Sequence, residues 1–294
     1  MHEAESRNSE LSPLRRRARG AVFVIHLFPA VMNAAAGFVF YLIAARAWEI
    51  WPALLLALSI FLVSAAVGGM NDFLDVELDR TSRPEKPLVR GDLAPRTAFV
   101  ISAVAAVAGV VLSALFGQPV MLVALLVLAV GLAYDLWLKD TLFSWAPYGV
   151  GIPALPVWGF LAAGSFTPVL LVSFPLGVLI ALALNLANTI PDIEGDTAFG
   201  IKGLAHQLGV DRSLAVTWIC FAVTIVLLAL TPVYLGNDPK LLFPGIAIGA
   251  VLLAATIIDR LISHSAAALR RGWYISAVLA GILGVAWVVS LPAN

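Results

Sequence analysis

Long apolar segments follow one another along almost all of this 294-residue chain, and they limit its fold more than any other feature. Each is close to the roughly 20 residues that a helix needs to cross the hydrocarbon core of a membrane. Only 12% of the residues are charged and 61% are hydrophobic. Lipid offers the backbone no hydrogen-bond partners, and no segment alternates like a barrel strand, so the segments must be helices. The sequence therefore predicts an all-α integral membrane protein.

Nine membrane-spanning helices are expected, in one domain over residues 21–294 that follows a polar tail at residues 1–20. Their approximate ranges are 21–45, 50–70, 97–116, 119–138, 142–163, 168–190, 213–235, 241–263 and 272–291. Two longer polar loops interrupt them, at about 71–96 and 192–212.

The distribution of charge predicts the orientation of these helices. On this topology 16 of the 18 Lys and Arg residues fall on the side that holds the N-terminus, and only Arg46 and Lys240 fall on the other. Positively charged loops remain in the cytoplasm. We therefore expect a multi-pass protein of the cell membrane whose N-terminus and two polar loops are cytoplasmic. The net charge of zero indicates no nucleic acid partner.

The first polar loop begins with a regularly spaced set of oxygen-bearing side chains. Asn71, Asp75 and Asp79 are four residues apart, so they share one face if the second span continues as a helix. Such a column of carboxylates repels itself unless a positive charge lies against it. Oxygen-only ligands of this kind suit Mg²⁺, which prefers one or two carboxylates together with water and phosphate oxygens.

A second column repeats the same spacing at the end of the sixth span, where Asn188, Asp192 and Asp196 surround Pro191. Either column alone is also compatible with an ordinary solvated acidic loop. Together, at the cytoplasmic ends of two spans, they predict a site that holds a diphosphate through Mg²⁺. The metal would neutralise the phosphate oxygens and make diphosphate a better leaving group.

Basic residues near these columns are candidates for contacts with the diphosphate, because charge-assisted hydrogen bonds are the usual partners of phosphate oxygens. The candidates are Arg80, Arg83, Lys86, Lys139 and Lys202. Their alternative role is to mark the cytoplasmic side of the membrane. Tyr134, close to Lys139, either lines the reaction site or belongs to an interfacial aromatic belt.

The motifs resemble those of the UbiA superfamily of intramembrane prenyltransferases. Asn71-x3-Asp75-x3-Asp79 is similar to the first aspartate-rich motif of that family, and Asp192-x3-Asp196 to the second. Tyr134-x4-Lys139 is similar to its tyrosine–lysine element, but four residues instead of the usual three separate the pair, and Asp135 adds a carboxylate.

The resemblance implies nine helices around a central cavity that holds an isoprenyl diphosphate with its tail between the helices. An electron-rich acceptor, aromatic or from another lipid pathway such as quinone biosynthesis, would attack the allylic carbocation. The metal ligands implied are Asn71, Asp75, Asp79, Asp192 and Asp196. The implied catalytic residues are Asp75, Asp79, Asp192, Asp196, Lys139 and Tyr134, with Arg80, Arg83, Lys86, Lys202 and Asn188 binding substrate.

Two other functions are compatible with part of this pattern. Some relatives in this superfamily quench the cation within its own chain, which would make the protein a membrane terpene cyclase. A cation-coupled transporter would carry charges in mid-span, whereas here the acidic clusters lie at span ends beside basic loops. In the first span, His26 and Asn33 lie on one face, where they would contact the acceptor or form an interhelical hydrogen bond.

Overall fold

The computed structural model describes residues 12–193 and 203–292, and all the regular elements in these ranges are helices. The longer ones are α2 (Pro13–Val24), α3 (Leu27–Ala45), α4 (Ile50–Leu74), α6 (Pro95–Ala114), α7 (Gln118–Leu136), α8 (Ala146–Ala162), α9 (Ser173–Thr189), α12 (Val210–Tyr234), α13 (Pro239–Ile262) and α14 (Ala266–Val289). The short ones are α5 (Val76–Ser82), η1 (Leu138–Asp140), η2 (Pro168–Val172), η3 (Ile190–Asp192) and α11 (Leu204–Leu208).

The all-α membrane architecture predicted from hydropathy is confirmed. In the described part of the chain, 8 helices are long and apolar enough to cross a membrane, with η2, α9 and η3 forming a single span over Pro168–Asp192. Helix α8, the fifth predicted span, has 17 residues. At about 1.5 Å per residue it is roughly 26 Å long, somewhat less than a hydrocarbon core of about 30 Å. The count of nine spans and the cytoplasmic N-terminus remain predictions.

The first predicted span, residues 21–45, is wrong as a single helix. It is divided into α2 and α3 at Ile25 and His26, and His26 has a φ of 47° in the left-handed region. Pro29 supplies the physical reason, because it has no N–H for the carbonyl of Ile25 and its ring would clash with that carbonyl in a continuous helix. The expected polar tail therefore already contains most of α2.

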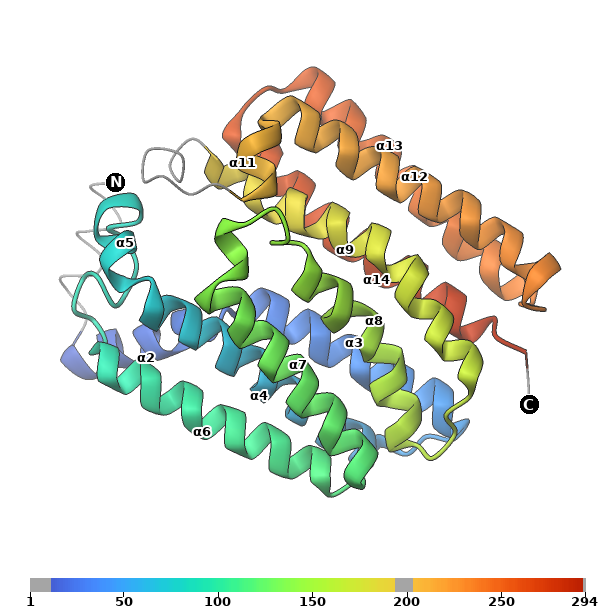
Figure 1. Cartoon of the computed structure of the whole chain (residues 1–294), viewed down its shortest axis with the longest axis horizontal. Coiled ribbons are helices and arrows are strands. Elements are labelled where there is room, and N and C mark those ends of the chain that lie inside the picture. The colour runs from blue at the N-terminus through green and yellow to red at the C-terminus, as the bar shows by residue number, and fades with distance from the viewer. Residues whose placement is uncertain (1–11, 194–202, 293–294) are drawn as a thin grey trace.

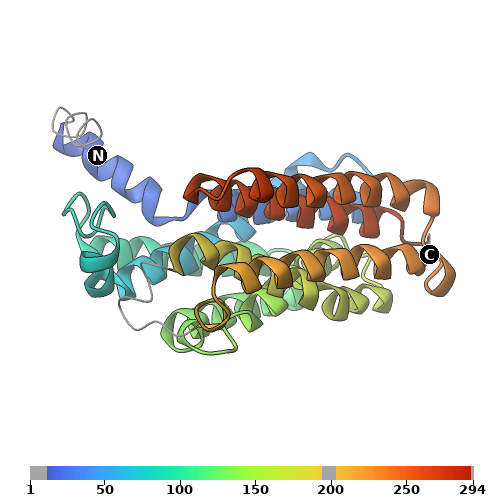
Figure 2. The ribbon, with the colours of Figure 1, turned by 90° about the horizontal axis from the view of Figure 1, so that it is seen from above.

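The helices run side by side, and the ends of the bundle differ in character (Figure 1). Helices α2, α5 and α11 lie at one end, and the C-terminal end of α14 lies at the other. Seen from above, the molecule is elongated along its helices, and α2 extends beyond the bundle (Figure 2). The described parts of the two polar loops thus lie at one end of the bundle, although they are far apart in the sequence.

Helices α4 and α6 pack closely against each other. The Ser59 hydroxyl donates to the Gly109 carbonyl at 2.7 Å. A Cβ atom at Gly109 would lie 2.8 Å from Val63 Cγ2, so a larger residue would push the helices apart. Close approach through small residues is the usual way in which membrane helices associate. The Trp158 indole of α8 joins this contact by donating to Ser113 Oγ at 3.2 Å.

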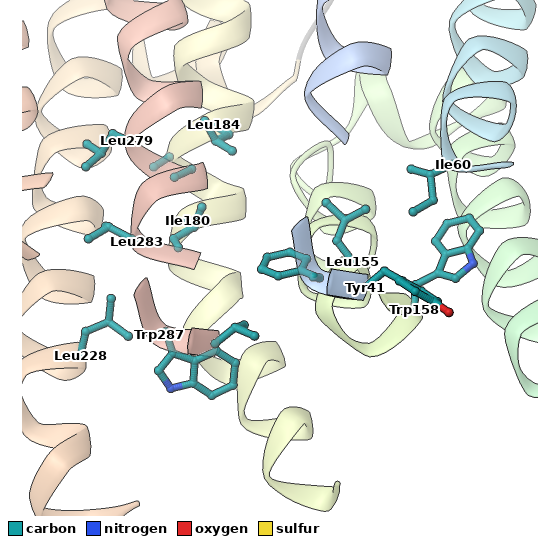
Figure 3. Packing of buried hydrophobic residues seen from close by; sticks show 14 of the residues in the cluster. Tyr41, Ile60, Leu155, Trp158, Ile180, Leu184, Leu228, Leu279, Leu283 and Trp287 are labelled. Atoms are coloured by element: carbon teal, nitrogen blue, oxygen red, sulfur yellow. The ribbon is translucent and has the colours of Figure 1, made fainter. Parts of the chain in front are cut away.

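A cavity of about 610 Å³ lies between two groups of helices. Figure 3 shows buried hydrophobic residues of α9, α12 and α14 facing those of α3, α4 and α8, and most of the labelled residues also line this cavity. The apolar lining includes Phe40, Ile60, Leu155, Trp158, Ile180, Leu184, Leu228, Leu283 and Trp287. Along α4 the lining extends from Ile60 to Asp75, roughly 22 Å at about 1.5 Å per residue. The cavity therefore runs along the bundle towards the polar end.

Candidate active site

The first acidic motif lies where α4 passes into α5. Asp75 separates the two helices, but the helical hydrogen-bond spacing continues through it. Its N–H donates to the Asn71 carbonyl at 2.9 Å, and the Asp79 N–H donates to the Asp75 carbonyl at 2.8 Å. Asn71, Asp75 and Asp79 all line the cavity, as a shared helical face predicts.

The second motif approaches the first from α9 and η3. Asn188 and Asp192 line the same cavity, and the Arg83 guanidinium Nη2 donates to Asp192 Oδ2 at 2.8 Å. This contact joins the loop of the first motif to the end of the sixth predicted span. Asp196 and Lys202, also expected in the site, lie outside the described residues.

Two lysines pair with the carboxylates of the first motif. Lys139 Nζ, which follows α7 in η1, bonds to Asp75 Oδ1. Lys86 Nζ bonds to Asp79 Oδ2 at 2.7 Å and to Asp72 Oδ1 at 2.8 Å. With Arg83 on Asp192, each carboxylate of the two motifs that the structure describes has a basic partner. The negative charge of the acidic column is therefore neutralised by basic side chains from other segments.

Asp72 is a buried carboxylate that binds the Lys86 ammonium next to the first motif. It is only 3% exposed, and His26 Nε2 lies 3.1 Å from Asp72 Oδ1. Burial raises the pKa of Asp79, and Lys86 offsets this shift only in part. Burial also opposes the charge on Lys86, but Asp72 and Asp79 outweigh it and raise the pKa of the ammonium. Lys86 therefore stays charged between two carboxylates.

Two predicted phosphate ligands in the described residues, Lys86 and Arg80, are absent from the cavity lining. Lys86 is held by its two carboxylates, whereas Arg80 turns outward. Its side chain is exposed, and Nη1 lies 3.3 Å from Oε2 of the equally exposed Glu77. It is absent from the cavity lining, whereas Arg83, about one turn further along the chain, belongs to that lining.

Tyr134 lines the cavity beside a second tyrosine that the motifs do not single out. The rings of Tyr134 and Tyr148 are 6.2 Å apart and nearly perpendicular. Asn188 Nδ2 donates to the Tyr148 hydroxyl at 3.3 Å, which links α8 to the second motif. The position of Tyr148 after Pro147 in a proline-rich span is the only local signal that could have drawn attention to it.

The donor atoms fit Mg²⁺ bound together with a phosphate ligand. In the parts of the chain that the structure describes, no three His, Cys, Asp or Glu side chains are grouped as a metal site. Asp75, Asp79 and Asp192 nevertheless bring carboxylate oxygens into the cavity, with the Asn71 amide beside them. Mg²⁺ commonly takes one or two carboxylates and completes its octahedron with water and phosphate oxygens. The site is thus suited to an open Mg²⁺–diphosphate complex, not to a closed protein cage.

A membrane bundle with a largely apolar cavity, lined at one end by paired acids and bases, defines an intramembrane site for an amphiphilic ligand with an anionic head. The chain belongs to the UbiA prenyltransferase family, whose model matches residues 30–275.

Two relatives and one solved structure illustrate the relationship. The digeranylgeranylglyceryl phosphate synthase of Korarchaeum cryptofilum is 27% identical over 174 residues, which cover 59% of this chain and 62% of the relative. The synthase of the same name from Thermococcus kodakarensis is 29% identical over 222 residues, covering 74% of each chain. A UbiA homolog from Archaeoglobus fulgidus bound to GPP and Mg²⁺ has a TM-score of 0.69 at 18% identity, covering 92% of this chain and 100% of that one. The last comparison shows a shared fold.

Proposed function

We propose that this protein is a Mg²⁺-dependent prenyltransferase that moves an isoprenyl group from an isoprenyl diphosphate to a glyceryl phosphate lipid. One observation carries the proposal. The described residues of two acidic motifs far apart in the sequence line the same end of one cavity, and most of the remaining lining is apolar. A diphosphate head and a hydrocarbon tail need this division between a charged end and an apolar interior.

The protein groups have separable tasks in this reaction. Bound Mg²⁺, held by Asp75, Asp79, Asp192 and the Asn71 amide, would neutralise the diphosphate. Arg83 and Lys139, now on Asp192 and Asp75, are placed to donate to phosphate oxygens once the carboxylates take the metal.

The bond changes then follow from the chemistry of an allylic diphosphate. The C1–O bond breaks and the diphosphate leaves with the electron pair. The acceptor hydroxyl oxygen bonds to C1, and its proton leaves with the diphosphate. Apolar walls that include Trp158 and Leu283 exclude water, which would otherwise capture the carbocation.

The names of the relatives support the choice of acceptor. Both synthases named above are digeranylgeranylglyceryl phosphate synthases, and this favours a glyceryl phosphate lipid over the aromatic acceptor and the quinone pathway expected from the family resemblance. The homolog from Archaeoglobus fulgidus bound to GPP and Mg²⁺ supports the donor and the metal. The charge distribution supports a cytoplasmic active site in the cell membrane.

Diphosphate release by the purified protein tests the proposal. Dimethylallyl, geranyl and geranylgeranyl diphosphate would each be supplied with Mg²⁺, alone, with a prenylglyceryl phosphate, or with aromatic acids. We expect release that requires Mg²⁺ and the glyceryl phosphate. An aromatic product would change the acceptor, and a cyclic product formed without any acceptor would identify a terpene cyclase. Folded protein that releases no diphosphate under any condition would refute the proposal.

A further inference from the structure

The tyrosine–lysine element carries a carboxylate that the proposed reaction leaves without a task. Asp135 is near the end of α7 and is only 3% exposed. Its Oδ1 accepts a hydrogen bond from Asn71 Nδ2 at 3.1 Å. Its Oδ2 is buried without a hydrogen-bond partner among the described residues. A buried oxygen without a hydrogen-bond partner lowers the stability of the fold. A functional role for the Asp135 carboxylate would account for its presence at this position.

The hydrogen bonds of Asn71 indicate a role for Asp135. Asn71 Nδ2 donates to Asp75 Oδ2 at 3.1 Å as well as to Asp135 Oδ1. Asp75 is paired with the Lys139 ammonium, and an ionised carboxylate only accepts hydrogen bonds. The reverse orientation of the Asn71 amide would place its carbonyl oxygen against Asp75, so the amino group must face Asp75 and, with it, Asp135. The Oδ1 atom is then the one that Asn71 can offer to a ligand in the cavity.

Asp75 and Asp135, the two acceptors of the Asn71 amino group, would respond differently to a bound metal. Asp75 is itself an expected metal ligand, and its oxygens would be drawn towards the cation. Asp135 belongs to a different helix, and it holds the amino group of Asn71 whatever Asp75 does. From this geometry we infer that Asp135 is a positioning residue, which orients the Asn71 amide so that its Oδ1 completes the Mg²⁺–diphosphate site.

This inference rests on the proposed function, because it assumes that the first motif binds a divalent cation. Residues that orient a metal ligand typically contribute about 10-fold to 100-fold to metal affinity. Replacement of Asp135 should therefore weaken metal binding, and it should do so only because the Asn71 amide is no longer held in place.

Binding of Mn²⁺ together with inorganic diphosphate, followed by the electron paramagnetic resonance signal of the metal, tests the inference on the full chain. Asp135→Ser has a side chain too short to reach Asn71, and we expect it to weaken Mn²⁺ binding about tenfold or more. Asp135→Asn still presents an acceptor oxygen and should stay within about threefold of the wild type. Glu77→Gln, which removes an exposed acid close to the same motif, is the matched control and should bind normally. Thermal unfolding of each variant shows that it is folded.

A double-mutant cycle separates positioning from a general structural role. In an Asn71→Ala background, Asp135→Ser should weaken Mn²⁺ binding no further. A second full loss in that background would overturn the inference, and so would normal binding by Asp135→Ser alone. Equal weakening by Asp135→Asn and Asp135→Ser would assign the effect to charge and overturn it as well. Wild-type protein that binds no Mn²⁺ would overturn the proposed function and this inference with it.

Discussion

Arg83 Nη2 and Asp192 Oδ2 are 2.8 Å apart although their residues are 109 positions apart in the chain. This ion pair connects the loop after α5 to the end of the span that contains α9 and η3. Both side chains are partly exposed at the polar end of the cavity. The pair is therefore accessible to a ligand that would offer Arg83 a phosphate and Asp192 a metal.

Replacement of Arg83 should weaken donor binding more than it slows the chemical step. A hydrogen bond to a charged group contributes about 1.5–3 kcal/mol, so we expect Arg83→Gln to raise the KM for isoprenyl diphosphate by roughly tenfold or more. Steady-state diphosphate release at saturating Mg²⁺ measures this. Arg80→Gln is the matched control, since Arg80 lies outside the cavity lining. An equal effect of both variants would show that only the charge of the loop matters.

Loss of either motif should stop turnover, because the two motifs act on one ligand. We expect Asp75→Asn and Asp192→Asn each to lower kcat at least 100-fold, in the range that follows removal of a group that stabilises developing charge. Steady-state product formation at saturating substrates and Mg²⁺ would measure kcat. Glu77→Gln should retain wild-type rates. Substantial activity in Asp192→Asn would remove the second motif from the site.

Lys86 should contribute to stability because it neutralises two buried carboxylates. Lys86→Met leaves Asp72 and Asp79 close together without their ammonium partner. Breaking a buried ion pair in this way costs about 3–5 kcal/mol. Thermal unfolding in detergent should show a clearly lower midpoint, and Asp72→Asn added to Lys86→Met should recover part of it. An unchanged midpoint for Lys86→Met would mean that the cluster is solvated in solution.

The length of the donor tail should depend on a glycine in the cavity wall. Gly281 of α14 lines the cavity, and a Cβ atom there would meet no atom within 4 Å. Gly281→Leu should therefore occupy space needed by a long tail, and leucine is also a better helix former than glycine. We expect kcat/KM for geranylgeranyl diphosphate to fall about tenfold or more, since each misfit methylene costs about 1–3 kcal/mol.

Dimethylallyl diphosphate should be affected much less by the same change. Gly272→Leu provides the control, because Gly272 lies on the same helix, has equally open space, and is outside this cavity. A uniform loss for all donors in Gly281→Leu would show that the tail does not pass this position.

Short-range patterns predicted the outline of the site well. The spacing of Asn71, Asp75 and Asp79 places them on one face because a helix repeats every 3.6 residues, and all three line the cavity. The division between α2 and α3 was harder to predict, because the hydropathy of residues 21–45 is continuous and only Pro29 carries the signal for a break. Arg80 and Arg83 are equivalent by composition, and nothing local shows that one turns outward.

The sequence by itself determined that this protein is a helical membrane bundle with two acidic motifs at span ends, because hydropathy and helical spacing act over neighbouring residues. Only the tertiary structure decided which base meets which acid: Lys139 on Asp75, Lys86 between Asp72 and Asp79, and Arg83 on Asp192. Such pairs depend on how α4, α7 and α9 pack around the cavity. Contacts between segments far apart in the chain leave no local pattern to read.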